Sequence, residues 1–121
     1  HINGRWYQLE ALTHVKSDDP VEGLEASILQ KYLLTPILDI DEPRTNKRID
    51  FVGGIRGMEE LERRCQTDCA VAFALPPISI EQLLSVADSG QVMPPKSTWF
   101  EPKLRSGFVV RLLDRITRRK D

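Results

Sequence analysis

The sequence predicts an α+β fold of two layers, with about four strands in one sheet and three helices packed against it. Two patterns in the 121-residue chain carry this prediction. Short apolar runs of strand length alternate with segments whose apolar residues recur every three or four positions, which is the spacing of an amphipathic helix. The expected order is roughly β-α-β-α-β-α-β. Such alternation is typical of a layered fold but leaves the strand directions open.

The first strand is expected over residues 5–12, which are rich in aromatic and other strand-forming side chains. Asn3 and Gly4 precede it, and this pair is a strong signal for a hairpin turn. The first helix is expected over residues 21–38, where the apolar residues follow the helical spacing. Pro36 should kink or end this helix, because proline has no N–H and clashes with the preceding turn.

The next strand, the next helix and the strand after it follow in quick succession. Residues 49–52 (IDFV) form a short apolar run, and a glycine-rich loop over 53–57 separates it from a helix-like segment over 58–66. Residues 69–77 (CAVAFALPP) are then continuously apolar, which is typical of a strand at the centre of a sheet. The two prolines at the end of this run stop the strand.

The third helix has the clearest boundaries of the chain. Ser79 followed by Gln82 fits a capping box, in which the two side chains satisfy free amides at a helix start. Gly90 is a natural helix end. An irregular loop with three prolines follows over 94–107, and GFVVRLL over 107–113 is the last expected strand.

The composition argues against several classes of protein. The chain is 40% hydrophobic and 29% charged, so it should fold as a single domain spanning residues 1–121. Seventeen Lys and Arg oppose eighteen Asp and Glu, and this balance disfavours a nucleic-acid partner or an anionic membrane surface. No apolar run approaches the ~20 residues of a membrane span and no secretory signal is visible, so the expected location is cytoplasmic. The chain begins without Met on a segment that resembles the middle of a sheet, so we expect a fragment.

Cys65 and Cys69 are the two cysteines of the chain. Their spacing could place both on one face of a helix, yet a C-x-x-x-C pair with two distant histidines is poor evidence for zinc. We interpret them as free thiols and expect no metal centre of this kind.

The first candidate site is the glycine turn between the second strand and its helix. Glycines there let successive main-chain amides converge on a phosphate or carboxylate, and the helix start adds its positive end. Arg56 could add paired hydrogen bonds. The anion-binding residues of this turn would be Gly53, Gly54, Arg56 and Gly57. The alternative is a tight turn that needs a positive φ and binds nothing.

The second candidate site is the basic loop before the same strand. Arg44, Lys47 and Arg48 precede Asp50, and such cations would suit a negatively charged substrate. Asp50 could bind a metal ion or act as a catalytic base. The alternative is a solvated basic loop without a ligand.

The third candidate site is the proline-rich loop. Lys96, Ser97 and Thr98 offer a cation and two hydroxyls in three consecutive positions, and Lys103 and Arg105 add positive charge. Prolines restrict such a loop, and the neighbouring Trp99 and Phe100 could anchor it or stack on a ring. The alternative is a surface loop packed by its own aromatic side chains. Neither this loop nor the rest of the chain shows a nucleophile with its base.

Long strings of the sequence resemble a known family. RIDFVGGIRG, AVAFALPP and VADSGQVMPPKSTWFEPKLRSGFVV are similar to the C-terminal part of the bacterial proteins grouped as domain of unknown function 1015, and GRWYQL and EPRTNKRIDF extend the similarity over most of the chain. The resemblance implies a longer bacterial protein of which this chain is the C-terminal part. Its earlier part would carry a motif like that of ParB-like nucleotide-binding proteins, and ParB-like relatives include a serine kinase. The two cysteines and the basic tail depart from the family pattern.

The resemblance and the three sites together suggest a domain that binds a phosphorylated small metabolite or nucleotide and takes part in phosphoryl transfer, with serine-related metabolism as an analogy. Lys96 and Asp50 are the expected catalytic residues, and Arg44 or Arg48 would balance charge in the transition state. ATP or Mg²⁺ are the cofactors that such chemistry would use. The rest of its own chain would be a partner. The alternatives are a nucleic-acid-binding or regulatory module that uses the same basic loops, and a structural domain that supports the missing N-terminal part.

Overall fold

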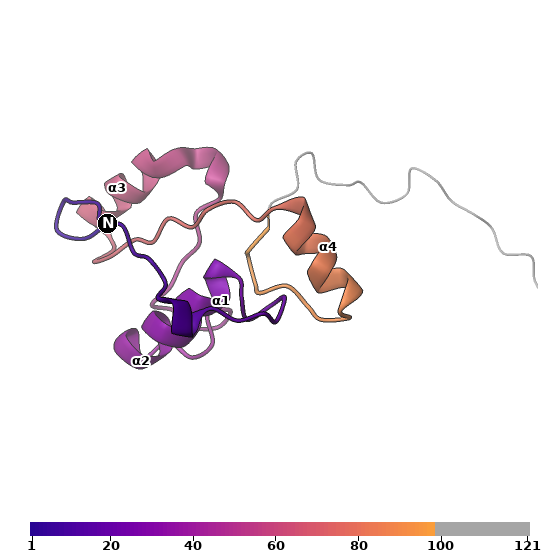
Figure 1. Ribbon diagram of the computed structural model, residues 1–121. Coiled ribbons are helices and arrows are strands. Elements are labelled where there is room, and N and C mark those ends of the chain that lie inside the picture. Colours follow the sequence, from indigo (N-terminus) through magenta and orange to yellow (C-terminus); the bar gives the residue numbers. More distant parts are fainter. Residues whose placement is uncertain (99–121) are drawn as a thin grey trace, which may run out of the picture.

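The computed structural model describes residues 1–98, and helices are the regular elements of this part (Figure 1). The first helical stretch consists of α1 (Glu25–Leu29), a π-helical segment (Gln30–Leu34) and α2 (Thr35–Leu38), which follow one another without a break. Two longer helices follow, α3 (Gly57–Thr67) and α4 (Ile80–Asp88). Single turns of 3₁₀-helix lie at Thr13–Val15 and Gly54–Arg56.

The predicted four-stranded sheet, and with it the two-layer α+β fold, is wrong for the residues that the structure describes. Residues 5–12, 49–52 and 69–77 contain no β-strand. The extended segments make only isolated bridges, between Ile2 and Arg5 and between Ile2 and Val71. The fourth expected strand, 107–113, lies outside the described residues. The alternating order of strands and helices therefore does not hold.

The expected strands fail because an apolar run becomes a strand only where another segment offers its main-chain N–H and C=O groups. The run over 69–77 meets such a partner at one place, where the Ala72 amide donates to the His1 carbonyl at 3.0 Å. Pro76 and Pro77 bring no N–H to a ladder. Residues 5–12 leave large apolar side chains exposed, and within residues 1–98 no second layer covers them. Composition alone could not reveal these missing partners.

The predicted helix over 21–38 is confirmed from Glu25 onward. It begins later than predicted because Asp19 closes a turn first. The Asp19 carboxylate accepts hydrogen bonds from the amides of Val21 and Glu22, both at 2.9 Å. Gly23 allows this turn, since a Cβ atom there would lie 2.6 Å from the Ser17 carbonyl oxygen. The residue after it, Leu24, is 1% exposed and begins the buried face.

Pro36 does not end the helix, but the helix changes its form just before it. The turn before it widens to the π form over Gln30–Leu34, and α2 then continues to Leu38. A wider turn is a known response to a residue that cannot donate its main-chain hydrogen bond. The stretch ends at Asp39, whose φ of 55° is left-handed. Gln30 then fixes the segment that follows α2, because its Nε2 donates to the Ile40 carbonyl at 2.6 Å.

The predicted boundaries of α4 are confirmed. The Ser79 hydroxyl accepts from the Gln82 amide at 3.2 Å, and the Gln82 side chain accepts from the Ser79 amide at 2.9 Å, which completes the capping box. At the other end Gly90 has a φ of 69°. The Gln91 amide reaches back to the Val86 carbonyl, as in a Schellman motif.

A few long-range contacts join these elements. Asn3 and Gly4, with φ of 50° and 75°, form the predicted turn, which brings Arg5 back to Ile2. Trp6 Nε1 donates to Glu62 on α3 at 2.6 Å, and Figure 1 shows the N-terminal segment beside this helix. The buried apolar residues are few: Leu24, Leu34, Ile40, Ala72 and Val86. No helix within residues 1–98 is long and apolar enough to span a bilayer.

Candidate functional site

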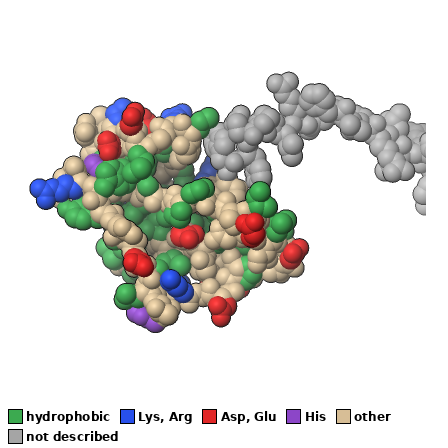
Figure 2. All heavy atoms as spheres, turned by 45° about the horizontal axis from the view of Figure 1, so that its top comes forward, with side chains coloured by type: hydrophobic (Ala, Val, Ile, Leu, Met, Phe, Trp, Pro, Cys, Tyr) green, Lys and Arg blue, Asp and Glu red, His purple; other side chains and the backbone are tan. Residues whose placement is uncertain are grey.

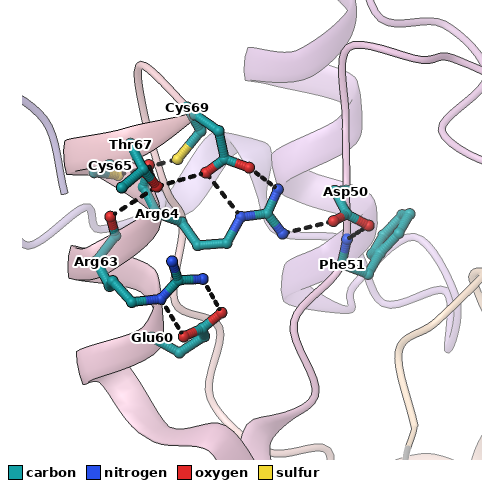
Figure 3. A network of polar contacts seen from close by, with 9 residues as sticks. Asp50, Phe51, Glu60, Arg63, Arg64, Cys65, Thr67 and Cys69 are labelled. Atoms are coloured by element: carbon teal, nitrogen blue, oxygen red, sulfur yellow. Dashed lines mark hydrogen bonds and ion pairs between the residues drawn. The ribbon is translucent and has the colours of Figure 1, made fainter.

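The densest polar network of the described residues lies at the C-terminal end of α3 (Figure 3). Arg64 donates through Nε and Nη2 to both carboxylate oxygens of Asp68, at 3.0 and 2.7 Å. Its Nη1 donates to Asp50 at 2.6 Å. Arg64 thereby connects the last turn of α3 to the extended segment before the glycine turn. The planar guanidinium suits this role because it presents several donors in a fixed plane.

Arg64 changes the chemistry of both carboxylates. Its hydrogen bonds lower the pKa of Asp50 below the ordinary aspartate value, and the Phe51 amide adds a second hydrogen bond in the same direction. The pKa of Asp68 is lowered by the same guanidinium. A general base works best with a pKa near the operating pH, so this geometry favours an ion-pairing role for Asp50. Within residues 1–98 no three His, Cys, Asp or Glu side chains gather where they could hold a metal ion.

The glycine turn has a geometry of its own. The Arg56 amide donates to the Gly53 carbonyl at 3.0 Å, and the Gly57 amide donates to the Gly54 carbonyl. Two of the amides expected to face an anion are therefore used inside the turn. Gly57 has a φ of 70°, which is the positive φ that a tight turn requires. The first turn of α3 also carries Glu59 and Glu60, which already complement the positive end of the helix.

The basic loop is held by its own short side chains. Glu42 accepts from the Arg44 amide at 3.1 Å, and Asn46 accepts from the Arg48 amide at 2.9 Å. Arg44, Lys47 and Arg48 are exposed. Within the described residues none of the three forms an ion pair, so their charges face solvent.

Lys96 occupies the tip of a tight turn in the proline-rich loop. The Ser97 amide and hydroxyl both donate to the Pro94 carbonyl, at 3.4 and 2.7 Å. Lys96 itself has a φ of 59°, which side-chain-bearing residues rarely adopt. Thr98 is exposed beside the turn. Lys103 and Arg105, the remaining predicted anion-binding residues, lie outside the described residues.

A shallow hollow of about 340 Å³ lies between the 17–24 loop and α4. Its polar lining consists of Ser17, Asp18, Asp19, Glu81, Gln82 and Ser85. None of the predicted anion-binding residues described by the structure lines it. The sequence did not predict this hollow, because its lining comes from two segments far apart along the chain. Beside it Gln91, which follows α4, donates through Nε2 to Asp19 Oδ2 at 2.8 Å. The acidic lining of the hollow does not suit an anion.

Arg64 and Asp68 were also missed, although their spacing held a signal. Opposite charges four residues apart on a helix lie side by side, and this pair does so. The contact of Arg64 with Asp50 had no such signal, since fourteen positions separate the two residues.

Comparison with family models, curated proteins and solved structures gave no match to this chain. The resemblance noted in the sequence therefore stays a prediction.

Proposed function

We propose that this chain binds a phosphorylated small molecule and that Lys96 is its principal cationic contact. The observation that carries the proposal is the conformation of Lys96. An exposed lysine at a φ of 59° occupies the third position of a turn, where glycine is the residue with least strain. Backbone strain of this kind persists where the surrounding structure imposes it, and it is enriched at functional sites.

The neighbours of Lys96 explain how the strained conformation is maintained. Pro95 precedes it, and proline favours the second position of such a turn because its φ is fixed. Ser97 closes the turn through two hydrogen bonds to Pro94. The Lys96 ammonium forms no ion pair with any residue within 1–98. A lysine presented by a restricted turn loses less backbone entropy on binding than one in a flexible loop.

Other cations support the same proposal. Arg44, Lys47, Arg48 and Arg56 are exposed and make no ion pair within the described part of the chain. Phosphate oxygens accept charge-assisted hydrogen bonds from such groups. In the wider form of the proposal the bound molecule is a nucleotide or a phosphorylated metabolite, serine-related by analogy, that takes part in phosphoryl transfer. Lys96 then stabilises the charge of the transferring group, with ATP and Mg²⁺ as cofactors.

Replacing Lys96 by glycine tests the proposal with two opposite effects. Lys96→Gly should keep or raise the melting temperature of the free protein, because it relieves a positive φ that costs about 1 kcal/mol or more. The same variant should lose most of the increase in melting temperature that phosphoserine or ATP produces in the unchanged chain by mass action. Thermal unfolding at several ligand and salt concentrations measures both effects.

Lys16→Gly is the matched control. It removes the same charge from a position whose φ is −73°, so it relieves no strain and should leave ligand stabilisation intact. An equal ligand effect in Lys96→Gly and the unchanged chain would contradict the proposal. Stabilisation by oligonucleotides alone, with a steep dependence on salt, would instead favour the nucleic-acid alternative.

One observation favours a second candidate function, that of a structural domain that packs against another part of a protein. Thirteen large hydrophobic side chains are exposed among the described residues, and five apolar residues are buried. Figure 2 shows hydrophobic side chains spread over one face between charged groups. Extended apolar surface is typical of interaction sites. Under this candidate phosphorylated ligands do not raise the melting temperature of the unchanged chain. They do not raise that of Lys96→Gly either.

A further inference from the structure

The two cysteines of the chain meet at the C-terminal end of α3. Cys65 lies in the last turn of the helix, and Cys69 follows the residue that ends it. Their sulfur atoms are 3.3 Å apart, within hydrogen-bonding distance for thiols. Both side chains are half-buried, and Figure 3 shows them directed toward each other. Four positions separate the two residues, and α3 ends between them, so the contact forms where the chain leaves the helix.

The local backbone leaves room for the sulfur atoms to come closer. A disulfide bond needs an S–S distance of about 2.05 Å, so the two sulfurs must approach by roughly 1.2 Å. Asp68, between them in sequence, has φ of −140° and ψ of −3°, so the chain has already left the helical path before Cys69. The Cys69 amide shares the Arg64 carbonyl with the Asp68 amide, at 3.0 and 2.9 Å. Moving Cys69 toward Cys65 therefore disturbs the end of the helix and not its interior.

We propose that Cys65 and Cys69 form a reversible dithiol–disulfide pair, a modification site whose co-reactant is a small-molecule disulfide. In the first step the Cys65 thiol loses its proton to solvent, and its sulfur attacks one sulfur of the co-reactant. The S–S bond of the co-reactant breaks, a mixed disulfide forms, and the small thiolate that leaves takes a proton from solvent. In the second step the Cys69 thiol loses its proton to solvent, attacks the Cys65 sulfur and releases the second small thiol. The protein loses two electrons and two protons, and the co-reactant gains them.

The surroundings assign Cys69 to the second step. Burial and the neighbouring Cys65 thiol raise the pKa of Cys69 to about 11, and Asp68 contributes in the same direction. Cys69 is therefore protonated at neutral pH. An intramolecular attack tolerates a small thiolate fraction, because the two sulfur atoms are already in contact.

The polar network gives the disulfide a structural consequence. Asp68 lies directly before Cys69 and holds two donors of Arg64, whose third contact is Asp50. A displacement of Cys69 toward Cys65 changes the position of Asp68 and hence the geometry of the Arg64 fork. The redox state of the pair is thereby coupled to the contact that holds the segment before the glycine turn against α3.

Glutathione mixtures provide the direct test. The full reduced chain is equilibrated with increasing ratios of oxidised to reduced glutathione, free thiols are trapped by alkylation, and intact mass is measured. We expect a monomer that has lost two hydrogen atoms and carries no glutathione. Since the chain has two cysteines, this product can only be the Cys65–Cys69 disulfide. Cys65→Ser and Cys69→Ser should instead accumulate a glutathione adduct.

A matched control keeps two thiols but separates them. Cys69→Ser combined with Gln66→Cys places the thiols at neighbouring helix positions, which do not face each other. Its equilibrium constant for intramolecular closure should be at least about tenfold lower than that of the unchanged chain. Equal closure in the control, glutathione adducts on both cysteines, or disulfides between two chains would each overturn the proposal, as would thiols that stay reduced throughout.

A second measurement tests the coupling. The side-chain Nε–H resonance of Arg64, observed by nuclear magnetic resonance, should shift between the reduced and the oxidised chain. The Arg63 resonance serves as reference, because Arg63 pairs with Glu60 one turn away and not with Asp68. A disulfide that forms without any change at Arg64 would overturn the coupling but not the disulfide.

Discussion

At the residue scale, Arg64 joins two segments of the described chain through its side chain, although the sequence did not indicate it as a candidate site residue. It binds Asp68 within its own helix and Asp50 on another segment. Its side chain is 22% exposed, compared with 66% for Asp50. The sequence predicted Asp50 as a metal ligand or catalytic base and did not indicate Arg64 as its partner. The partner of a side chain depends on which segment folds next to it.

The raised pKa of Cys69 predicts how stability changes in alkali. The pKa of Cys69 rises from the ordinary thiol value of 9.0, which the unfolded chain should have, to about 11 in the folded chain. Between these values the unfolded state binds fewer protons, so the free energy of unfolding falls as the pH rises. The contribution is fully present below about pH 9 and is lost toward pH 11. Urea unfolding across this range should show a steeper loss for the unchanged chain than for Cys69→Ser.

The comparison with Cys69→Ser is needed because lysines and tyrosines titrate over the same range. They are common to both chains, so the difference in slope reports Cys69. Burial of the thiol raises the pKa of Cys69 most, Cys65 and Asp68 raise it further, and Arg64 opposes them. Identical slopes in the two chains would show that the thiol has the same pKa in the folded and unfolded states.

At the element scale, α4 shows how far local signals can define a helix. Its start is set by Ser79 and Gln82 and its end by Gly90, all within a segment of twelve positions. The helical stretch over residues 25–38 depends on more distant contacts, since Gln30 reaches across ten positions to hold the exit at Ile40. The π-helical segment before Pro36 allows the helix to continue past a residue that cannot donate a main-chain hydrogen bond.

Removing the cap of α4 should destabilise the chain measurably. Ser79→Ala leaves the Gln82 amide without its acceptor, and such a loss costs about 1 kcal/mol, within a range of roughly 0.5–2. Chemical denaturation followed by circular dichroism measures the change in the free energy of unfolding. Ser79→Asp retains an acceptor and should stay close to the unchanged chain. Equal destabilisation by both substitutions would argue that the hydroxyl itself, and not capping, is required.

At the scale of the whole molecule, the small core decides stability. Leu24 and Val86 are each 1% exposed, although Leu24 directly precedes α1 and Val86 lies on α4. Most other large apolar residues of the described chain keep part of their surface in contact with water. A molecule of this kind depends strongly on each buried side chain.

Truncating the most buried leucine should therefore have a large effect. Leu24→Ala removes buried surface and leaves a cavity, which costs about 2–5 kcal/mol for leucine in a protein core. Leu12→Ala is the control, because Leu12 is 66% exposed and should change the free energy of unfolding little. Denaturant unfolding of both variants measures the difference. Similar small effects of the two substitutions would mean that Leu24 is not part of a cooperative core.

The local turns of the candidate site were predictable from the sequence, but the contacts between its segments were not. The prolines made a restricted loop foreseeable, and the glycines made a turn with positive φ foreseeable, which the structure places at Gly57. Whether distant loops approach one another was not foreseeable. The ion pair of Asp50 and the hollow beside α4 both arise from residues far apart in sequence.

By itself the sequence determined the features that a few neighbouring residues can complete: the turn at Asn3 and Gly4, the capping box at Ser79, the helix end at Gly90 and the helical periodicity. Tertiary structure alone decided whether the apolar runs became strands, and within residues 1–98 they did not. The physical reason is the location of the hydrogen-bond partners. A helix or a turn finds its partners within about five residues of the same segment, whereas a strand needs a second segment whose position the local sequence does not specify.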